Sequence, residues 1–178
     1  MKTTLRWIKR LILLLIILLA IGLAGFFTFA PGYVEAQRNA VLPHDPYPVS
    51  AAAQALHDDL LIGDWHADPL LWKRDLTRRS SRGQVDLPRL RDGNVAMQVF
   101  TAVTKSPAGQ NYQQNSAAAL DNITLLAIGQ LWPIRSWDSL LQRALYQAEK
   151  LHRFEAAAPE HLKIITSLAE LEAVLAAR

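Results

Sequence analysis

One uninterrupted apolar segment stands near the start of the chain, and the remainder alternates between apolar and polar positions. Residues 11–30 contain no charged side chain. About twenty helical residues at roughly 1.5 Å each cover the ~30 Å hydrocarbon core of a bilayer. The pattern therefore predicts a transmembrane anchor over residues 11–30.

The flank before this segment is basic. Residues 1–10 contain no acid, and their basic residues are Lys2, Arg6, Lys9 and Arg10. Because basic flanks stay in the cytoplasm, we expect a single-pass protein whose following domain is exported, into the periplasm or outside the cell. Signal-peptide cleavage near residues 34–36 is the alternative. An uncleaved anchor is favoured because the apolar run is longer than a signal-peptide core and lies well before that site.

A stretch with several prolines follows the anchor. Residues 31–55 include Pro31, Pro43, Pro46 and Pro48. Prolines at this density favour extended, semi-rigid chain. We therefore predict a linker over residues 31–55 and a folded domain over residues 56–178.

The first part of that domain alternates between strand and helix patterns. A short helix over residues 49–57 precedes an apolar strand over residues 60–68. Asp86, followed closely by Pro88, is typical of a helix start. Residues 95–103 are apolar on both faces, which suits a strand of a parallel sheet.

Helical periodicity returns after residue 116. It predicts helices over residues 117–131 and from Ser136, a third strand over residues 162–165, and a last helix begun by a capping box at Ser167 and Glu170. The fold class is thus α/β. The residues expected to face the core of the helix from Ser136 and of the last helix are Leu140, Leu141, Ala144, Leu145, Ala148, Leu151, Phe154, Leu168, Leu171, Val174 and Leu175.

Charge and cysteine content narrow the function classes. The chain has 19 basic and 16 acidic residues, but four of the basic ones lie in the flank before the anchor. The exported part is therefore near neutral, and nucleic acid is not an expected partner. The absence of cysteine excludes disulfides and a thiolate nucleophile.

His66 and Asp68 stand two residues apart at the end of the first predicted strand. Alternate residues of a strand point to the same side, so the imidazole and the carboxylate project together. This pair suits zinc or a similar divalent ion. The alternative is a strand-end turn in which Asp68 helps to start the turn at Pro69. The pair His152 and Glu155, one helical turn apart, is expected to be a surface pair.

Two motifs resemble the membrane dipeptidase family, also called renal dipeptidases. They are GDWHADP at residues 63–69 and VDLPRLRDGNVAMQVF at residues 85–100. The resemblance implies a (β/α)8 barrel of the TIM type, dipeptide substrates and a binuclear zinc site. It assigns His66 and Asp68 as ligands of one zinc, and it names no further catalytic or cofactor-binding residue in this chain. A homodimer is left open.

The length after the anchor is short for that barrel. About 120 residues follow Leu60, whereas a complete barrel takes at least ~200. We therefore expect the N-terminal part of a (β/α)8 barrel, preceded by the transmembrane helix. The family's bridging glutamate and later histidines have no counterpart here. Alone, the chain is expected to be inactive and not to fold stably.

The basic loop over residues 73–82 follows the ligand pair. In a barrel such a loop lies over the mouth of the site, where an arginine fork would suit the carboxylate of a dipeptide. The alternative is a solvated loop with Asp75 as a partial partner.

Two other function classes stay open. One is a non-catalytic, bitopic membrane protein whose exported part is an interaction module. The other is a metal-dependent hydrolase of the wider amidohydrolase type, ranked lower because such enzymes usually begin with His-x-His.

Overall fold

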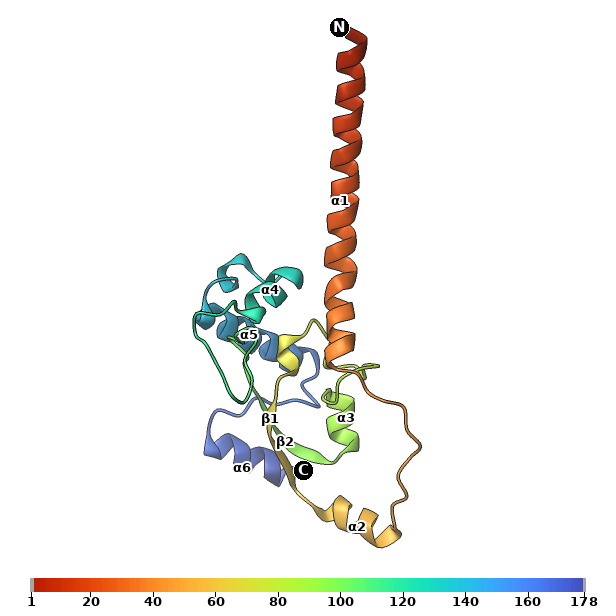
Figure 1. Ribbon diagram of the computed structural model, residues 1–178. Coiled ribbons are helices and arrows are strands. Elements are labelled where there is room, and N and C mark those ends of the chain that lie inside the picture. Colours follow the sequence, from red (N-terminus) through yellow and green to blue (C-terminus); the bar gives the residue numbers. More distant parts are fainter. Residues whose placement is uncertain (1, 178) are drawn as a thin grey trace.

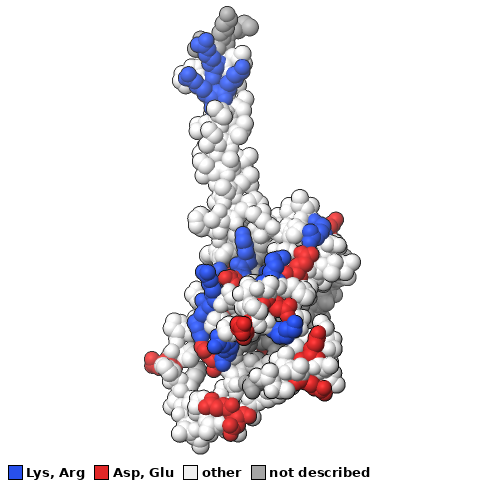
Figure 2. Space-filling model, turned by 180° about the vertical axis from the view of Figure 1, so that it is seen from behind, with Lys and Arg blue, Asp and Glu red and all other residues white. Residues whose placement is uncertain are grey.

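A single long helix and a small mixed domain make up the protein (Figure 1). The structure, a computed structural model, describes residues 2–177. Helix α1, Lys2–Arg38, projects away from the remainder and is long and apolar enough by composition to cross a membrane. In Figure 2 basic side chains gather at its N-terminal end, and its middle carries no charged side chain on this face.

The prediction of extended chain directly after the anchor is wrong for residues 31–38. They continue α1 through Pro31. Proline removes one intrahelical hydrogen bond, but the last turn gains a fixed partner because Glu35 forms ion pairs with the loop after the first strand. Within the predicted linker over residues 31–55, only residues 39–50 lie outside a helix.

Local capping signals set the starts of the next helices. Helix α2, Ala51–Asp59, begins where Ser50 Oγ accepts a hydrogen bond from the Ala53 amide at 3.2 Å. Helix α3, Leu87–Asp92, begins where the Asp86 carboxylate accepts from the Arg89 amide at 3.0 Å. Both helices were predicted. The cap of α3 at Asp86 was predicted as well, because a side-chain cap requires only neighbouring residues.

Strands β1, Ile62–Ala67, and β2, Val95–Phe100, form a two-stranded parallel sheet. The connection between them runs through the 3-10 helix η1, Pro69–Leu71, a loop and α3. Asn94 enters β2 with a positive φ of 53°, and its side-chain amide donates to the carbonyls of His57 and Leu60 at 2.9 and 3.0 Å. This residue ties the starts of the two strands together.

The predicted third strand is wrong. Residues 162–165 form no strand in the described chain. The amide of Ile164 donates instead to the Glu155 carboxylate at 2.9 Å. A side-chain acceptor thus takes the place of a neighbouring strand.

The last helix starts as predicted but does not bury its apolar residues. In α6, Leu168–Ala176, Ser167 Oγ accepts from the Glu170 amide at 3.3 Å. No residue of α6 is buried, and Leu168 is 70% exposed. The expectation that Leu168, Leu171, Val174 and Leu175 face a core is therefore wrong, since the sheet has two strands and the predicted third strand, before this helix, is absent from the described residues.

Two helices and a 3-10 turn enclose the core. Helix α4, Asn122–Gly129, is capped by Asp121, the turn η2 is Ile134–Ser136, and helix α5, Leu140–Ala157, is capped by Ser139. Helix α4 starts later than predicted. Ser136 is not the cap of α5, because it lies buried in η2, where its hydroxyl donates to the Pro133 carbonyl at 2.7 Å. The core cluster is Leu71, Ile123, Ala127 and Trp132.

Helix α5 buries a different face from the one predicted. Its buried residues are Arg143, Gln147 and Lys150, whereas Leu141 is 65% exposed. Irregular segments cover this face, and their carbonyls need donors. Arg143 donates to the carbonyls of Ser136 and Thr104 at 2.8 and 2.7 Å. Hydrogen bonds to these backbone carbonyls therefore decide which face of α5 turns inward. The predicted residues Leu140, Leu141, Ala144, Leu145, Ala148, Leu151 and Phe154 are exposed or only partly buried.

Candidate metal site at the end of the first strand

The structure brings His66 and Asp68 together at the C-terminal end of β1. His66 Nε2 lies 3.2 Å from Asp68 Oδ2. The His66 side chain is 71% exposed and the Asp68 side chain 38% exposed. Asp68 also stands at the N-terminus of η1, although its side chain makes no capping hydrogen bond there. The carboxylate is thus directed to the imidazole and not to the following turn.

A residue of the neighbouring strand end holds Asp68. The hydroxyl of Thr101 donates to Asp68 Oδ1, and the Thr101 amide donates to the Ala67 carbonyl at 2.9 Å. Sequence reasoning did not identify Thr101. The parallel register, in which Ala67 pairs with Phe100, is the signal that places the next residues of both strands side by side.

Asp64 lies on the same strand and lines the same pocket. Its Oδ1 accepts from the His66 amide at 3.1 Å. That hydrogen bond, followed by one from the Gln98 side chain, lowers the pKa of Asp64 below its ordinary value. Asp64 therefore stays ionised and braces the backbone of His66.

The pair faces an open pocket of about 410 Å³. His66, Asp68, Trp72 and Gly83 line it together with Asn39, which follows the end of α1. Ligand pockets usually measure about 300–1,000 Å³, so this one has room for a small substrate. Within residues 2–177, no cluster of three or more His, Cys, Asp or Glu side chains could hold a metal ion. The arrangement offers one nitrogen and one oxygen ligand.

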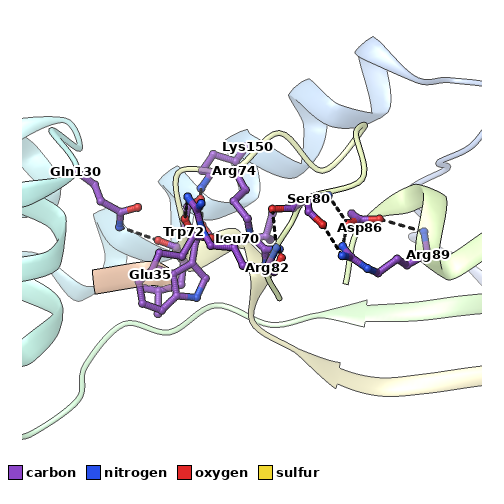
Figure 3. A network of polar contacts seen from close by, with 11 residues as sticks. Glu35, Leu70, Trp72, Arg74, Ser80, Arg82, Asp86, Arg89, Gln130 and Lys150 are labelled. Carbon is purple, nitrogen blue, oxygen red and sulfur yellow. Dashed lines mark hydrogen bonds and ion pairs between the residues drawn. The ribbon is translucent and has the colours of Figure 1, made fainter. Parts of the chain in front are cut away.

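The basic loop does not offer the arginine fork that was considered. Arg74 Nε lies 2.8 Å from Glu35 Oε1, and Arg82 Nη2 donates to Glu35 Oε2 at 2.8 Å (Figure 3). The hypothesis of a substrate carboxylate held by this loop is therefore wrong for Arg74 and Arg82, because Glu35 already occupies both. Asp75 makes an ion pair of 3.4 Å with Arg78, as the alternative predicted.

Asp86 fixes the other end of the basic loop, next to the ion pairs of Glu35. Its Oδ2 accepts from the Ser80 amide at 3.0 Å and from the Arg89 guanidinium (Figure 3). The Asp86 side chain is fully buried. The predicted helix cap is therefore also the fixed point of the loop that lines the pocket. Far from the pocket, His152 and Glu155 form the predicted surface pair, with Nδ1 and Oε2 3.6 Å apart.

Comparison with known proteins identifies the family of this chain. Neither a curated protein nor a solved structure matches the chain. A family model described as membrane dipeptidase, peptidase family M19, matches residues 50–178. The match covers both motifs, β1 with its histidine and aspartate, and every element of the domain. The chain belongs to the membrane dipeptidase family.

Proposed function

We propose that this chain supplies the first strand and helix units of a membrane-anchored zinc dipeptidase. Residues 56–178 would form the start of its (β/α)8 barrel, joined to the anchor over residues 11–30 by the segment up to residue 55. The family match and the parallel connection from β1 to β2 support this proposal. Active sites of such barrels lie at the C-terminal ends of the strands, where His66 and Asp68 stand.

His66 and Asp68 would hold the metal. The observation that carries the proposal is their separation of 3.2 Å on an open pocket, since one ion between two such groups can bind both. Zinc takes neutral imidazole nitrogen and ionised carboxylate oxygen, and catalytic sites usually have three protein ligands. These residues therefore fit part of one zinc shell. The family's binuclear site requires further ligands.

A bound zinc ion supplies an activated water and polarises the carbonyl to be cleaved. The chain's own residues prepare the site. The hydroxyl of Thr101 turns one oxygen of Asp68 away and leaves Oδ2 toward the pocket. Asp64 fixes the backbone of His66. The pocket takes a substrate of dipeptide size.

The location follows from the apolar helix. With the basic flank in the cytoplasm, the domain is exported and acts on dipeptides outside the cytoplasmic membrane. The charge distribution on α1, with basic side chains at its N-terminal end, supports this orientation (Figure 2).

The test is dipeptide hydrolysis by the complete protein, of which this chain supplies the first units, purified from its own membranes. We expect zinc-dependent hydrolysis that Asp68→Ala abolishes, together with a lower zinc content and an unchanged membrane fraction. Glu172→Gln, on the exposed surface of α6, is the matched control and keeps full activity. Full activity in Asp68→Ala would contradict the assignment.

A second candidate is a non-catalytic interaction module on a membrane anchor. The exposed leucines of α5, Leu140, Leu141 and Leu145, favour it because they offer an apolar surface. Sedimentation of residues 31–178 without zinc discriminates the two. A cooperatively folded monomer that binds no zinc supports the module, whereas zinc-dependent folding supports the enzyme.

A further inference from the structure

Glu35 lies in the last turn of α1 and is 2% exposed. The two guanidinium groups that contact it, those of Arg74 and Arg82, come from the loop after β1 (Figure 3). The Arg74 side chain is 6% exposed and that of Arg82 is 31% exposed. The contact between Glu35 and Arg82, which are 47 positions apart, thus lies at the junction of helix and domain.

The backbone closes the same junction. The amide of Gly83 donates to the carbonyl of Asn39 at 2.8 Å. Gly83 has a φ of +72°, and a Cβ there would lie 2.3 Å from Arg74 Nη1. Arg74 Nη1 in turn donates to the Arg82 carbonyl at 2.9 Å. The guanidinium of Arg74 therefore fills the turn that carries Arg82 and Gly83. A side chain at position 83 would displace it, and the positive φ there favours glycine.

Electrostatics make the junction sensitive to Glu35. Burial lowers the pKa of Arg74, and the charges of Glu35 and Asp86 oppose that shift while those of Arg82 and Arg89 add to it. Removing one partner of a buried ion pair leaves an uncompensated charge, which is strongly destabilising. Without Glu35, three guanidinium groups would face one carboxylate.

We propose that Glu35 locks the end of the membrane helix onto the loop that lines the pocket of His66 and Asp68. Asn39 and Arg74, which take part in the junction, also line that pocket. Glu35 comes five residues after the apolar run, a rise of about 8 Å. The pocket is therefore held at a fixed height and angle close to the bilayer surface, and Glu35 is a positioning residue. Only the reference to the bilayer rests on the proposed function.

The absence of cysteine in the chain allows a direct distance measurement. Spin labels are placed at Gln37→Cys on α1 and Ala156→Cys on α5, both exposed positions. In the full chain reconstituted in nanodiscs, pulsed electron resonance should give one narrow distance distribution. Glu35→Gln should broaden it toward the spread of about 20 Å that a flexible segment of residues 39–50 allows.

Arg82→Gln removes one ion pair at a partly exposed position and should broaden the distribution less. The Arg82→Gln variant keeps the test valid if Glu35→Gln does not fold. Glu172→Gln is the control and should leave the distribution narrow. Unchanged narrow distributions in Glu35→Gln and Arg82→Gln would overturn the proposal. No zinc or substrate enters the measurement, so its result does not depend on the proposed enzyme function. Carbonate extraction reports membrane insertion separately, so failure of the proposed anchor would be recognised as such.

Discussion

At the residue scale, single polar side chains decide the geometry of the candidate site. His66 and Asp68 are close in sequence, and their spacing alone predicted that they meet. Thr101 is 33 positions from Asp68, and its role depends on the register of two strands. Lys150 holds the segment after Asp68, because its ammonium group donates to the Leu70 carbonyl at 2.6 Å and to the Trp72 carbonyl (Figure 3).

Replacement of Thr101 by valine keeps the shape and removes the hydroxyl that orients Asp68. We expect zinc affinity to fall about 10-fold to 100-fold, the usual effect of losing a group that orients a ligand. Competition with a chromophoric chelator measures it. Thr104→Val is the control, since the Thr104 hydroxyl makes no hydrogen bond among the described residues. Equal affinities in the two variants would count against an orienting role.

Lys150 predicts a pH dependence of stability. Burial, followed by the charge of Arg153, lowers its pKa from 10.5 to about 8. Between these values the unfolded chain binds a proton that the folded chain has released, so stability rises with pH. Relative to Lys150→Met, the parent chain should gain about 3 kcal/mol across this window. Urea unfolding followed by the fluorescence of buried Trp132 measures the difference, and a flat difference would refute the effect.

At the scale of elements, the starts of α2, α3 and α6 were predictable, whereas the starts of α4 and α5 and the buried faces of the helices were not. Asp86 and Ser167 cap the helices they were expected to cap, since each bond lies within three residues. The strand at residues 162–165 fails because Glu155 takes the amide of Ile164. The inward face of α5 was missed because Arg143, Gln147 and Lys150 bind carbonyls of segments far away in sequence.

The burial pattern of α5 is testable by a pair of substitutions. Arg143→Leu removes the ion pair with Asp121 and leaves carbonyls without donors, so a loss of about 3–5 kcal/mol is expected. Leu141→Gln, on the exposed face, should stay within about 0.5 kcal/mol. Denaturant unfolding compares them. A larger loss in Leu141→Gln than in Arg143→Leu would contradict the burial pattern.

At the scale of the whole molecule, the α/β class and the apolar N-terminal helix were predictable from periodicity. The junction between them was not, because the ion pairs of Glu35 join two segments that look like linker and solvated loop in the sequence. Two motifs around β1 and β2 indicated the family, and the family model that matches residues 50–178 confirms it. The membrane helix and the domain meet at the pocket, which is lined both by the residue after the helix end and by residues of the first strand.

The most direct test of the account is X-ray absorption at the zinc edge on the zinc-loaded protein. We predict imidazole nitrogen and carboxylate oxygen at about 2.0–2.2 Å from the metal. The imidazole signal should weaken in His66→Gln and persist in His152→Gln, the matched exposed histidine on α5. An imidazole signal that His66→Gln leaves unchanged would mean that zinc binds elsewhere and that the end of β1 is not the metal site.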